Sequence, residues 1–258
     1  MQNSLPIVDI YRASSGPYSC SYLPAESATL EYRLPAKLAP LDWQFLLRRG
    51  WRRHGQNFFR PKCAHCVKCR SLRVDVERFR PTKSQRRSVS RNADIQVRLT
   101  RPAATPEHIE LYNAYHADMR DRRGWPHRMT NLLDYSESFL AGRWPFAHEL
   151  QYRRDGKLVG LGLVDVVPEG VSSIYFYHSP EWRPLSPGTF TVLQEIELVR
   201  RLGGRFLYLG YWIAECPSMA YKCRFGPHEI LERYVADEES PVWREPESVP
   251  TFEELDRN

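Results

Sequence analysis

The stretch GKLVGLGLVDVVPEGVSSIYFYHSPEWRPLSPGTFTVLQEIELVRRLGGRFLYLGYW, residues 156–212, decides the fold of this chain. Its apolar, β-branched runs at 158–167 and 171–177 predict two strands, and 206–212 predicts a third. Between the second and third strands, residues 189–204 repeat apolar positions at helical spacing and end in a glycine pair, which is typical of a helix and its C-cap. The order strand, strand, helix, strand predicts a mixed sheet covered by helices.

The flanking sequence extends this arrangement in both directions. Residues 146–153 are strand-like and lead through the turn residues Asp155 and Gly156 into the run at 158–167, so the two predict a hairpin. Further elements are expected as helices at 41–50, 106–121 and 135–140 and as strands at 72–76 and 95–99. The tail from residue 236 is acidic and broken by prolines, which indicates irregular structure.

The best candidate for a domain boundary is the segment RPAATP at 101–106. It separates a cysteine-rich, basic N-terminal region, residues 1–101, from a mixed-sheet domain, residues 102–258. The expected fold class is therefore α+β. No stretch approaches the roughly 20 apolar residues that span a bilayer, and no secretion signal is present, so a cytoplasmic location is expected.

Positive charge is concentrated in one fifth of the chain. The whole sequence has 37 Lys or Arg against 31 acids, but residues 48–101 have 17 Lys or Arg against Asp75, Glu77 and Asp94 alone. Like charges packed this densely repel one another unless a polyanion neutralises them, so the segment favours a nucleic-acid partner over a merely solvated face.

Three of the six cysteines form a CxxCxxC run within RPKCAHCVKCR, at Cys63, Cys66 and Cys69. In a reducing compartment this spacing indicates metal ligands more often than disulfides, because two-residue gaps let successive thiolates face one centre. A zinc ion or an iron–sulfur cluster needs a fourth ligand, for which Cys20, His65, Cys216 and Cys223 are available. The alternative is that these reduced cysteines pack as small apolar residues.

Several motifs in a fixed order resemble one family. They are CSYL at 20–23, RRGWRRHGQNFFRPKCAHCVKC at 48–69, SLRVDVERFRPTKSQRR at 71–87, and LYLGYWIAECPSMAYKCRFG at 207–226. Together with the strands and helix of 158–204, they are similar to the bacterial aspartate/glutamate leucyltransferases within the arginyltransferase-like aminoacyl-tRNA–protein transferases. The resemblance covers most of residues 18–231.

This resemblance implies a cysteine-bearing region followed by a GCN5-related (GNAT-like) acyltransferase domain. It implies transfer of Leu, or Arg in the arginyl branch, from tRNA to proteins that begin with Asp or Glu, which marks them for degradation. The partners would be aminoacyl-tRNA and those proteins, and short bacterial relatives favour Leu. By position, Cys20, Cys63, Cys66 and Cys69 match the cysteines that relatives link to a metal cluster.

The chemistry of this reaction suggests candidate residues in the second half. An aminoacyl ester is already activated, so placement of the amine, donors to the oxyanion and one proton acceptor suffice. Candidates for the proton and the oxyanion are Asp165, Tyr211 and Tyr221, although core packing of the tyrosines and a structural ion pair of Asp165 are alternatives. Cations for the acceptor's carboxylate are Lys222, Arg224 and Arg73.

The tRNA is expected to be held through its phosphates. The concentrated candidates lie in TKSQRRSVSR and are Lys83, Ser84, Gln85, Arg86, Arg87 and Arg91. The basic stripe is extended by Arg48, Arg49, Arg52 and Arg53.

Two other functions compete with this prediction. A CoA-dependent acyltransferase would share the strand–helix–strand order, but LSPGTF offers one glycine and a proline where a pyrophosphate needs amide donors, so no CoA is expected. A non-enzymatic RNA-binding protein with a metal-stabilised basic module explains the first half of the chain and leaves residues 207–226 unexplained.

Overall fold

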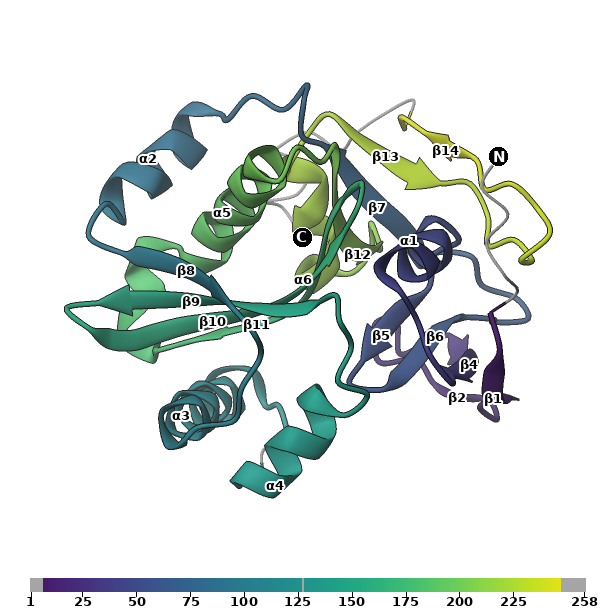
Figure 1. Cartoon of the computed structure of the whole chain (residues 1–258), viewed down its shortest axis with the longest axis horizontal. Helices are drawn as coiled ribbons and strands as arrows, with labels where there is room; N and C mark the ends of the chain where they lie inside the picture. The colour runs from purple at the N-terminus through teal and green to yellow at the C-terminus, as the bar shows by residue number, and fades with distance from the viewer. Residues whose placement is uncertain (1–6, 127, 247–258) are drawn as a thin grey trace.

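The main feature of the fold is an eight-stranded mixed sheet with the order β14-β13-β7-β12-β11-β10-β9-β8 (Figure 1). The computed structural model describes residues 7–126 and 128–246 of the 258. The strands are β7 (Arg70–Asp75), β8 (Gln96–Thr100), β9 (Ala147–Arg154), β10 (Lys157–Val167), β11 (Gly170–His178), β12 (Phe206–Trp212), β13 (His228–Leu231) and β14 (Trp243–Arg244). Of these, β11 and β12 pair in parallel and the other neighbours are antiparallel. The predicted α+β class with a mixed sheet is confirmed.

The main sheet draws strands from both sides of the predicted boundary at residue 101. Strand β7 pairs with β12 and β13, and β8 forms the edge beside β9. Both precede the boundary in sequence, yet they complete the sheet that the later strands begin. The cysteine-rich region and the sheet domain predicted from the sequence therefore share one sheet.

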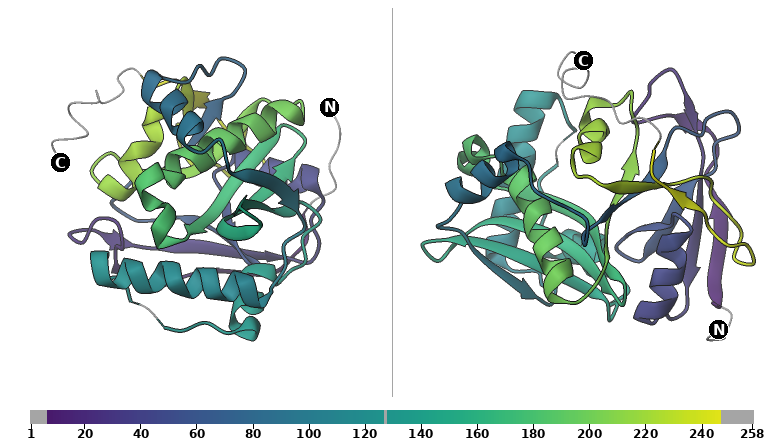
Figure 2. Two further views of the ribbon diagram at one scale, coloured as in Figure 1. Left: turned by 90° about the vertical axis from the view of Figure 1, so that its left-hand side faces the viewer. Right: turned by 90° about the horizontal axis from the view of Figure 1, so that it is seen from above.

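A smaller sheet lies to one side of the main one (Figures 1 and 2). It has the order β1-β4-β6-β5, from β1 (Asp9–Ser14), β4 (Leu30–Pro35), β5 (Arg52–His54) and β6 (Asn57–Pro61), next to a two-stranded ladder of β2 (Tyr18–Ser19) and β3 (Ser27–Ala28). Helix α1 (Pro40–Arg48) packs Trp43 and Leu46 against Phe58 and Phe146, which ties the smaller sheet to the larger.

Helices cover both faces of the main sheet (Figures 1 and 2). Helices α5 (Pro187–Arg201) and α2 (Lys83–Arg91) lie on one face, and α3 (Pro106–Arg123) lies on the other with α4 (Leu132–Tyr135) and the following π-turn η1 (Ser136–Leu140). Short turns at η2 (Pro180–Leu185), α6 (Pro217–Ala220) and η3 (Tyr221–Arg224) complete the chain. None of the helices in the described part of the chain has the length and apolar character to cross a membrane.

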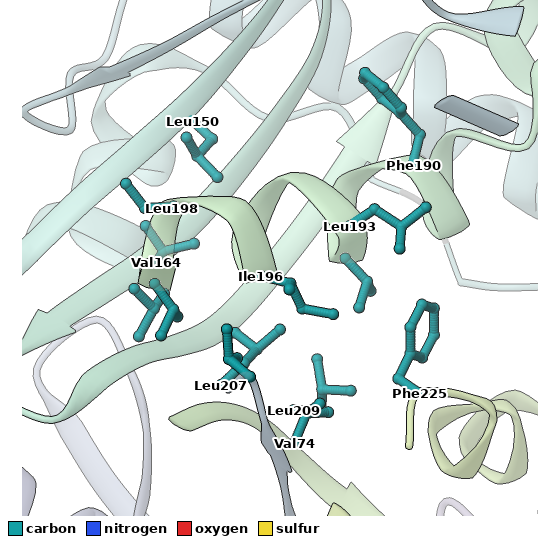
Figure 3. Close-up of a cluster of buried hydrophobic side chains, with 14 of the residues drawn as sticks. Val74, Leu150, Val164, Phe190, Leu193, Ile196, Leu198, Leu207, Leu209 and Phe225 are labelled. Carbon is teal, nitrogen blue, oxygen red and sulfur yellow. The ribbon is translucent and has the colours of Figure 1, made fainter. Parts of the chain in front are cut away.

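The largest core lies between α5 and the sheet (Figure 3). Leu193 and Ile196 of α5 face Leu207 and Leu209 of β12, and Val74 of β7 packs beside them. Burying each of these side chains stabilises the fold by about 1.5–3 kcal/mol. This packing fixes α5 over the junction of β11 and β12, which positions the site described below.

Two expectations from the sequence need correction. Residues 83–91 form helix α2, which polar composition alone had not predicted; Thr82 caps it, since its side chain accepts from the Gln85 amide and Gln85 bonds back. The tail is not irregular throughout, because Trp243 and Arg244 form β14 and pair with β13. Residues 247–258 lie outside the described residues.

Candidate active site

The parallel strands β11 and β12 pair over only a short stretch and then diverge. Over the described residues of both strands, pairing covers Gly170–Ser172 and Phe206–Tyr208, while the strands continue to His178 and Trp212. The backbone groups beyond the pairing need other partners, because buried polar groups are seldom left unpaired. The diverging ends therefore open a place between the strands into which polar side chains from other elements reach.

Arg52 of β5 fills this place from the smaller sheet. Its guanidinium donates to Ser172 Oγ at 2.8 Å and to the Ser173 carbonyl oxygen of β11. On the β12 side it lies against Gly210, where an added Cβ would come within 3.2 Å of the guanidinium; this glycine also has a positive φ of 81°. Glycine at position 210 therefore allows both the positive φ and the close approach of the Arg52 guanidinium. Burial lowers the pKa of Arg52.

Glu195 enters the same place from α5. It is fully buried, and its Oε1 accepts from Ser173 Oγ at 3.0 Å, while its Oε2 has no hydrogen-bond partner among the described residues. Burial raises the pKa of this carboxyl to about 8, against which the Ser173 bond and the charge of Arg52 act. A buried acid with a free oxygen is a group that accepts or holds a proton at neutral pH.

Lys222 of η3 is the third buried ionisable group at these strands. Its Nζ donates to the Tyr211 carbonyl oxygen of β12 at 2.7 Å and to Met219 Sδ at 3.2 Å. Only 8% of the residue is exposed, and no carboxylate pairs with it among the described residues. Burial, and to a lesser degree the charge of Arg52, lower the pKa of Lys222 to about 7. An incoming carboxylate would restore its charge.

These three residues make the diverging strand ends the best candidate active site. A buried acid and a buried amine whose pKa values are shifted toward neutrality, beside a buried guanidinium, are typical of functional sites. The arrangement offers cations for an anionic substrate and a group that exchanges protons near pH 7.

Tyr221 and Tyr211, both predicted as catalytic, differ in position. Tyr221 neighbours Lys222 and keeps 41% of its surface exposed, although burial of its ring and the charge of Glu195 raise its hydroxyl pKa to about 12. Tyr221 thus joins the site at its solvent side. Tyr211 is buried, and its hydroxyl donates to the carbonyl oxygens of Gly50 and Phe59 at 3.4 and 3.2 Å, so it has a structural role.

Asp165 is not placed to act as a proton acceptor. It is fully buried in β10, where Oδ2 accepts from Trp43 Nε1 at 2.8 Å and from Arg53 Nε at 2.7 Å, and Oδ1 pairs with Arg53 as well. Both oxygens are occupied by donors from α1 and β5. The alternative considered from the sequence, a structural ion pair, is the one that the structure supports.

Of the predicted substrate cations, Arg73 lies at a different site from Lys222. It pairs with Glu229, bonds Tyr208 Oη at 3.2 Å, and lies 3.7 Å from the Phe206 ring centroid. This places it at a separate surface pocket, and its charge is already matched. Arg224 belongs to the same turn as Lys222, and its carbonyl oxygen accepts from Gln85 Nε2 at 3.1 Å.

The four predicted metal ligands line one cavity of about 370 Å³. Cys20, Cys63, Cys66 and Cys69 are all free thiols, and burial together with the neighbouring cysteines raises the pKa of Cys69 to about 12. No group of three or more His, Cys, Asp or Glu residues within 7–126 and 128–246 is placed to hold a metal ion. The four thiols share this cavity, and metal binding by them stays a prediction. Cys216 and Cys223, named above among the possible fourth ligands, are buried core residues.

Helix α2 displays most of the predicted tRNA-binding residues to solvent, namely Lys83, Ser84, Arg86, Arg87 and Arg91. Gln85 is the exception, because it is buried and bonds both the helix cap and Arg224. The predicted extension of the basic stripe fails for three of its four arginines, Arg49, Arg52 and Arg53, which are buried.

Sequence reasoning missed Glu195 and misread Arg52. Glu195 lies three residues after Val192 and four before Val199, so it interrupts the apolar face of its helix. That position is a detectable signal. Arg52 gave no such signal, because its neighbours in RRGWRRHG are equally basic and only the pairing of β5 turns it inward.

Two family profiles cover the same halves that the motifs suggested. Arginine-tRNA-protein transferase, N terminus, matches residues 18–87, and arginine-tRNA-protein transferase, C terminus, matches residues 107–232.

The chain belongs to the arginine-tRNA-protein transferase family. This transferase is 35% identical over 224 residues to the aspartate/glutamate leucyltransferase of Helicobacter hepaticus, with 87% of the chain and 93% of the relative covered. It is 39% identical over 220 residues to the enzyme of that name from Halorhodospira halophila, with 83% and 91% covered. It is therefore an aminoacyltransferase, with aminoacyl-tRNA and protein as its substrates. A solved structure of FemX overlaps 78% of the chain and 79% of its own, with a TM-score of 0.44 and 9% identity.

Proposed function

We propose that this transferase moves leucine from leucyl-tRNA to the α-amine of proteins that begin with Asp or Glu. The relatives named above, matched over 93% and 91% of their length, are named aspartate/glutamate leucyltransferases, which supports leucine as the transferred group and an acidic acceptor. The observation that carries the acidic preference is Lys222, a buried amine without a carboxylate partner among the described residues. We place the reaction in the cytoplasm, where tRNA is charged.

In this proposal, the α-amine nitrogen attacks the leucyl carbonyl carbon, the amide bond forms, and the ester bond to the tRNA breaks. The amine gives up one proton, and the tRNA hydroxyl takes one as it leaves. A free α-amine has a pKa of about 8, so part of it is neutral at physiological pH without a strong base. Placement of the two substrates then supplies most of the rate enhancement.

Lys222 and Arg52 give the acceptor's side-chain carboxylate a cationic place to bind. Burial strengthens this attraction, since the surrounding dielectric is low. A neutral first residue would leave Lys222 without its counter-charge, so the site would bind such a protein less well.

Glu195 is the proposed carrier of the transferred proton. Its pKa of about 8 matches that of the α-amine, so a proton passes between them at little cost. It then returns the proton to the leaving hydroxyl. Tyr221, whose hydroxyl stays protonated because its pKa is about 12, would donate to the oxyanion.

Helix α2 is the proposed contact for the tRNA backbone. Its exposed Lys83, Arg86, Arg87 and Arg91 form a basic surface, and phosphate contacts of this kind give affinity without reading the sequence. Ser84 adds a neutral donor at the first turn of the helix.

The deciding experiment compares transfer of labelled leucine and arginine from charged tRNA to peptides that begin with Asp, Glu or Ala. We expect leucine on the two acidic peptides only. The Lys222→Met variant should lose preference for the acidic peptides, while Lys157→Met, which removes an exposed lysine of β10, should keep it. Transfer of arginine instead would change the donor, and tRNA binding without any transfer would contradict the enzymatic proposal.

A further inference from the structure

The cysteine-lined cavity has walls that are mainly apolar. Its volume of about 370 Å³ is at the small end of the roughly 300–1,000 Å³ of ligand sites. Ala28 and Leu30 of the N-terminal strands, Phe59 of β6, and Leu231 of β13 contribute carbon surface, and Val67, 87% exposed, lies beside the cysteines. Such a surface binds an aliphatic group well and a charged one poorly.

The charged side chains around the cavity are already engaged. Glu26 pairs with Lys68 at 3.3 Å and Glu232 with Arg244 at 2.9 Å. The two lining arginines are also bonded, since Arg233 pairs with Glu239 at 2.6 Å and Arg70 donates to the Leu231 carbonyl oxygen at 3.4 Å. A guanidinium or a carboxylate entering this cavity would compete with those bonds, whereas an aliphatic side chain would not.

The cavity adjoins the candidate active site through one strand residue. Tyr211 lines the cavity, and its carbonyl oxygen accepts a hydrogen bond from Lys222 Nζ at 2.7 Å. A substrate whose reacting carbonyl lies at the diverging ends of β11 and β12 can therefore place a short side chain in the cavity.

We propose that this cavity binds the side chain of the amino acid carried by the tRNA and thereby selects leucine. The inference rests on the proposed function. In it, the segments that carry Cys20, Cys63, Cys66 and Cys69 form the mouth of a pocket that selects the donor amino acid. The strands β3, β4, β6, β12 and β13 supply its walls, so the small sheet and the main sheet each contribute one side. Arginine is rejected because its guanidinium would lose hydration without gaining a free carboxylate.

The test changes the size of the cavity in both directions and measures donor preference. A single tRNA is charged with alanine, leucine or phenylalanine, and kcat/KM is measured with a peptide that begins with Asp. Ala28→Leu narrows the cavity and should lower the leucine-to-alanine ratio by about tenfold or more, since one methylene in such a pocket is worth about 10–200-fold. Leu30→Ala widens it and should raise the phenylalanine-to-leucine ratio by about tenfold.

Matched substitutions at exposed positions serve as controls. Ala114→Leu on α3 and Leu202→Ala after α5 make the same chemical changes away from the cavity and should leave both ratios within twofold of the wild type. The two cavity variants shift the ratios in opposite senses, so loss of folding in one of them does not remove the test.

Three results would overturn the inference. Unchanged donor ratios in an active Leu30→Ala variant would show that the leucyl group lies elsewhere. A change in preference between Asp and Ala peptides, with donor ratios constant, would place the acceptor in the cavity. A wild-type protein that transfers no leucine to any peptide would fail the proposed function itself, an outcome distinguishable from the other two because they require transfer.

Discussion

Arg52 and Arg53 are consecutive on β5, equally basic and both buried, yet the structure treats them differently. Arg53 meets Asp165, a carboxylate that also binds Trp43, so its charge is balanced inside the core. Arg52 meets a hydroxyl and a carbonyl of β11, and the acid near it, Glu195, keeps one oxygen free. A balanced buried ion pair stabilises one arrangement, whereas an incompletely balanced set can respond to a substrate.

The largest effect should come from breaking the balanced pair. Asp165→Asn leaves the Arg53 guanidinium buried without its counter-charge, and removal of one partner of such a pair costs about 3–5 kcal/mol in the free energy of unfolding. Urea denaturation at pH 7 would measure this loss. Glu195→Gln should not destabilise the protein at that pH, because Glu195 is largely protonated in the folded state there and glutamine has the same shape.

The difference in stability between the wild type and Glu195→Gln should depend on pH. Folding raises the pKa of Glu195 from about 4.3 to about 8, so the native state binds the extra proton between these values. The wild type should therefore lose stability relative to Glu195→Gln as the pH rises from about 5 to 8. A constant difference across this range would show that Glu195 is ionised in the folded protein.

Activity should reverse the order of the two acids. Glu195→Gln removes the proposed proton carrier and should lower kcat about 100-fold, as is usual for loss of a general base. Folded Asp165→Asn protein, assayed below its unfolding transition, should keep kcat within a few-fold of the wild type. If Asp165→Asn is instead the inactive variant and Glu195→Gln is active, the roles proposed for Glu195 and Asp165 are wrong.

Lys222 differs from both arginines because its charge should change near neutral pH and on binding of substrate. Its pKa of about 7 means that it is protonated at pH 6 and largely neutral at pH 8. The KM for a peptide that begins with Asp should therefore rise about tenfold across this range, the value of one charge-assisted bond. Lys222→Arg keeps its charge and should show a flat KM profile. Parallel profiles would remove Lys222 from carboxylate recognition.

The smallest effect should come from exposed arginines, whose charge is screened by salt. Arg87→Gln on α2 removes one proposed phosphate contact, so KM for leucyl-tRNA should rise by less than about tenfold and the log–log salt slope should fall by about 0.9. Lys37→Gln, an exposed lysine before α1, is the matched control and should leave the slope unchanged. An unchanged slope in Arg87→Gln would exclude α2 from the tRNA contact.

Sequence patterns predicted the fold with useful accuracy where a single face of an element is buried. The strands at 158–167 and 206–212 and the helix at 189–204 were found because their periodicity follows directly from burial. Helix α2 was missed, since its composition is polar and only Gln85 and Ser88 are buried.

The candidate site was predicted less well. Lys222 and Tyr221 were selected from the sequence and lie together, whereas Asp165, Tyr211 and Arg73 proved to be engaged elsewhere. Each candidate was chosen for the chemistry of its own side chain, without knowledge of its neighbours in the fold. The types of side chain were suitable for the reaction. Whether a given carboxylate or cation is available for it depends on the residues that it bonds in the folded protein.

The sequence alone determined the order of strands and helices, the concentration of basic residues in 48–101 and the family to which the chain belongs. These properties are local or compositional, so neighbouring residues are enough to encode them. Only the tertiary structure decided that Arg52, Glu195 and Lys222 meet at the diverging ends of β11 and β12. They come from three elements that are far apart in the chain, and their pKa shifts arise from burial, which exists only once those elements pack.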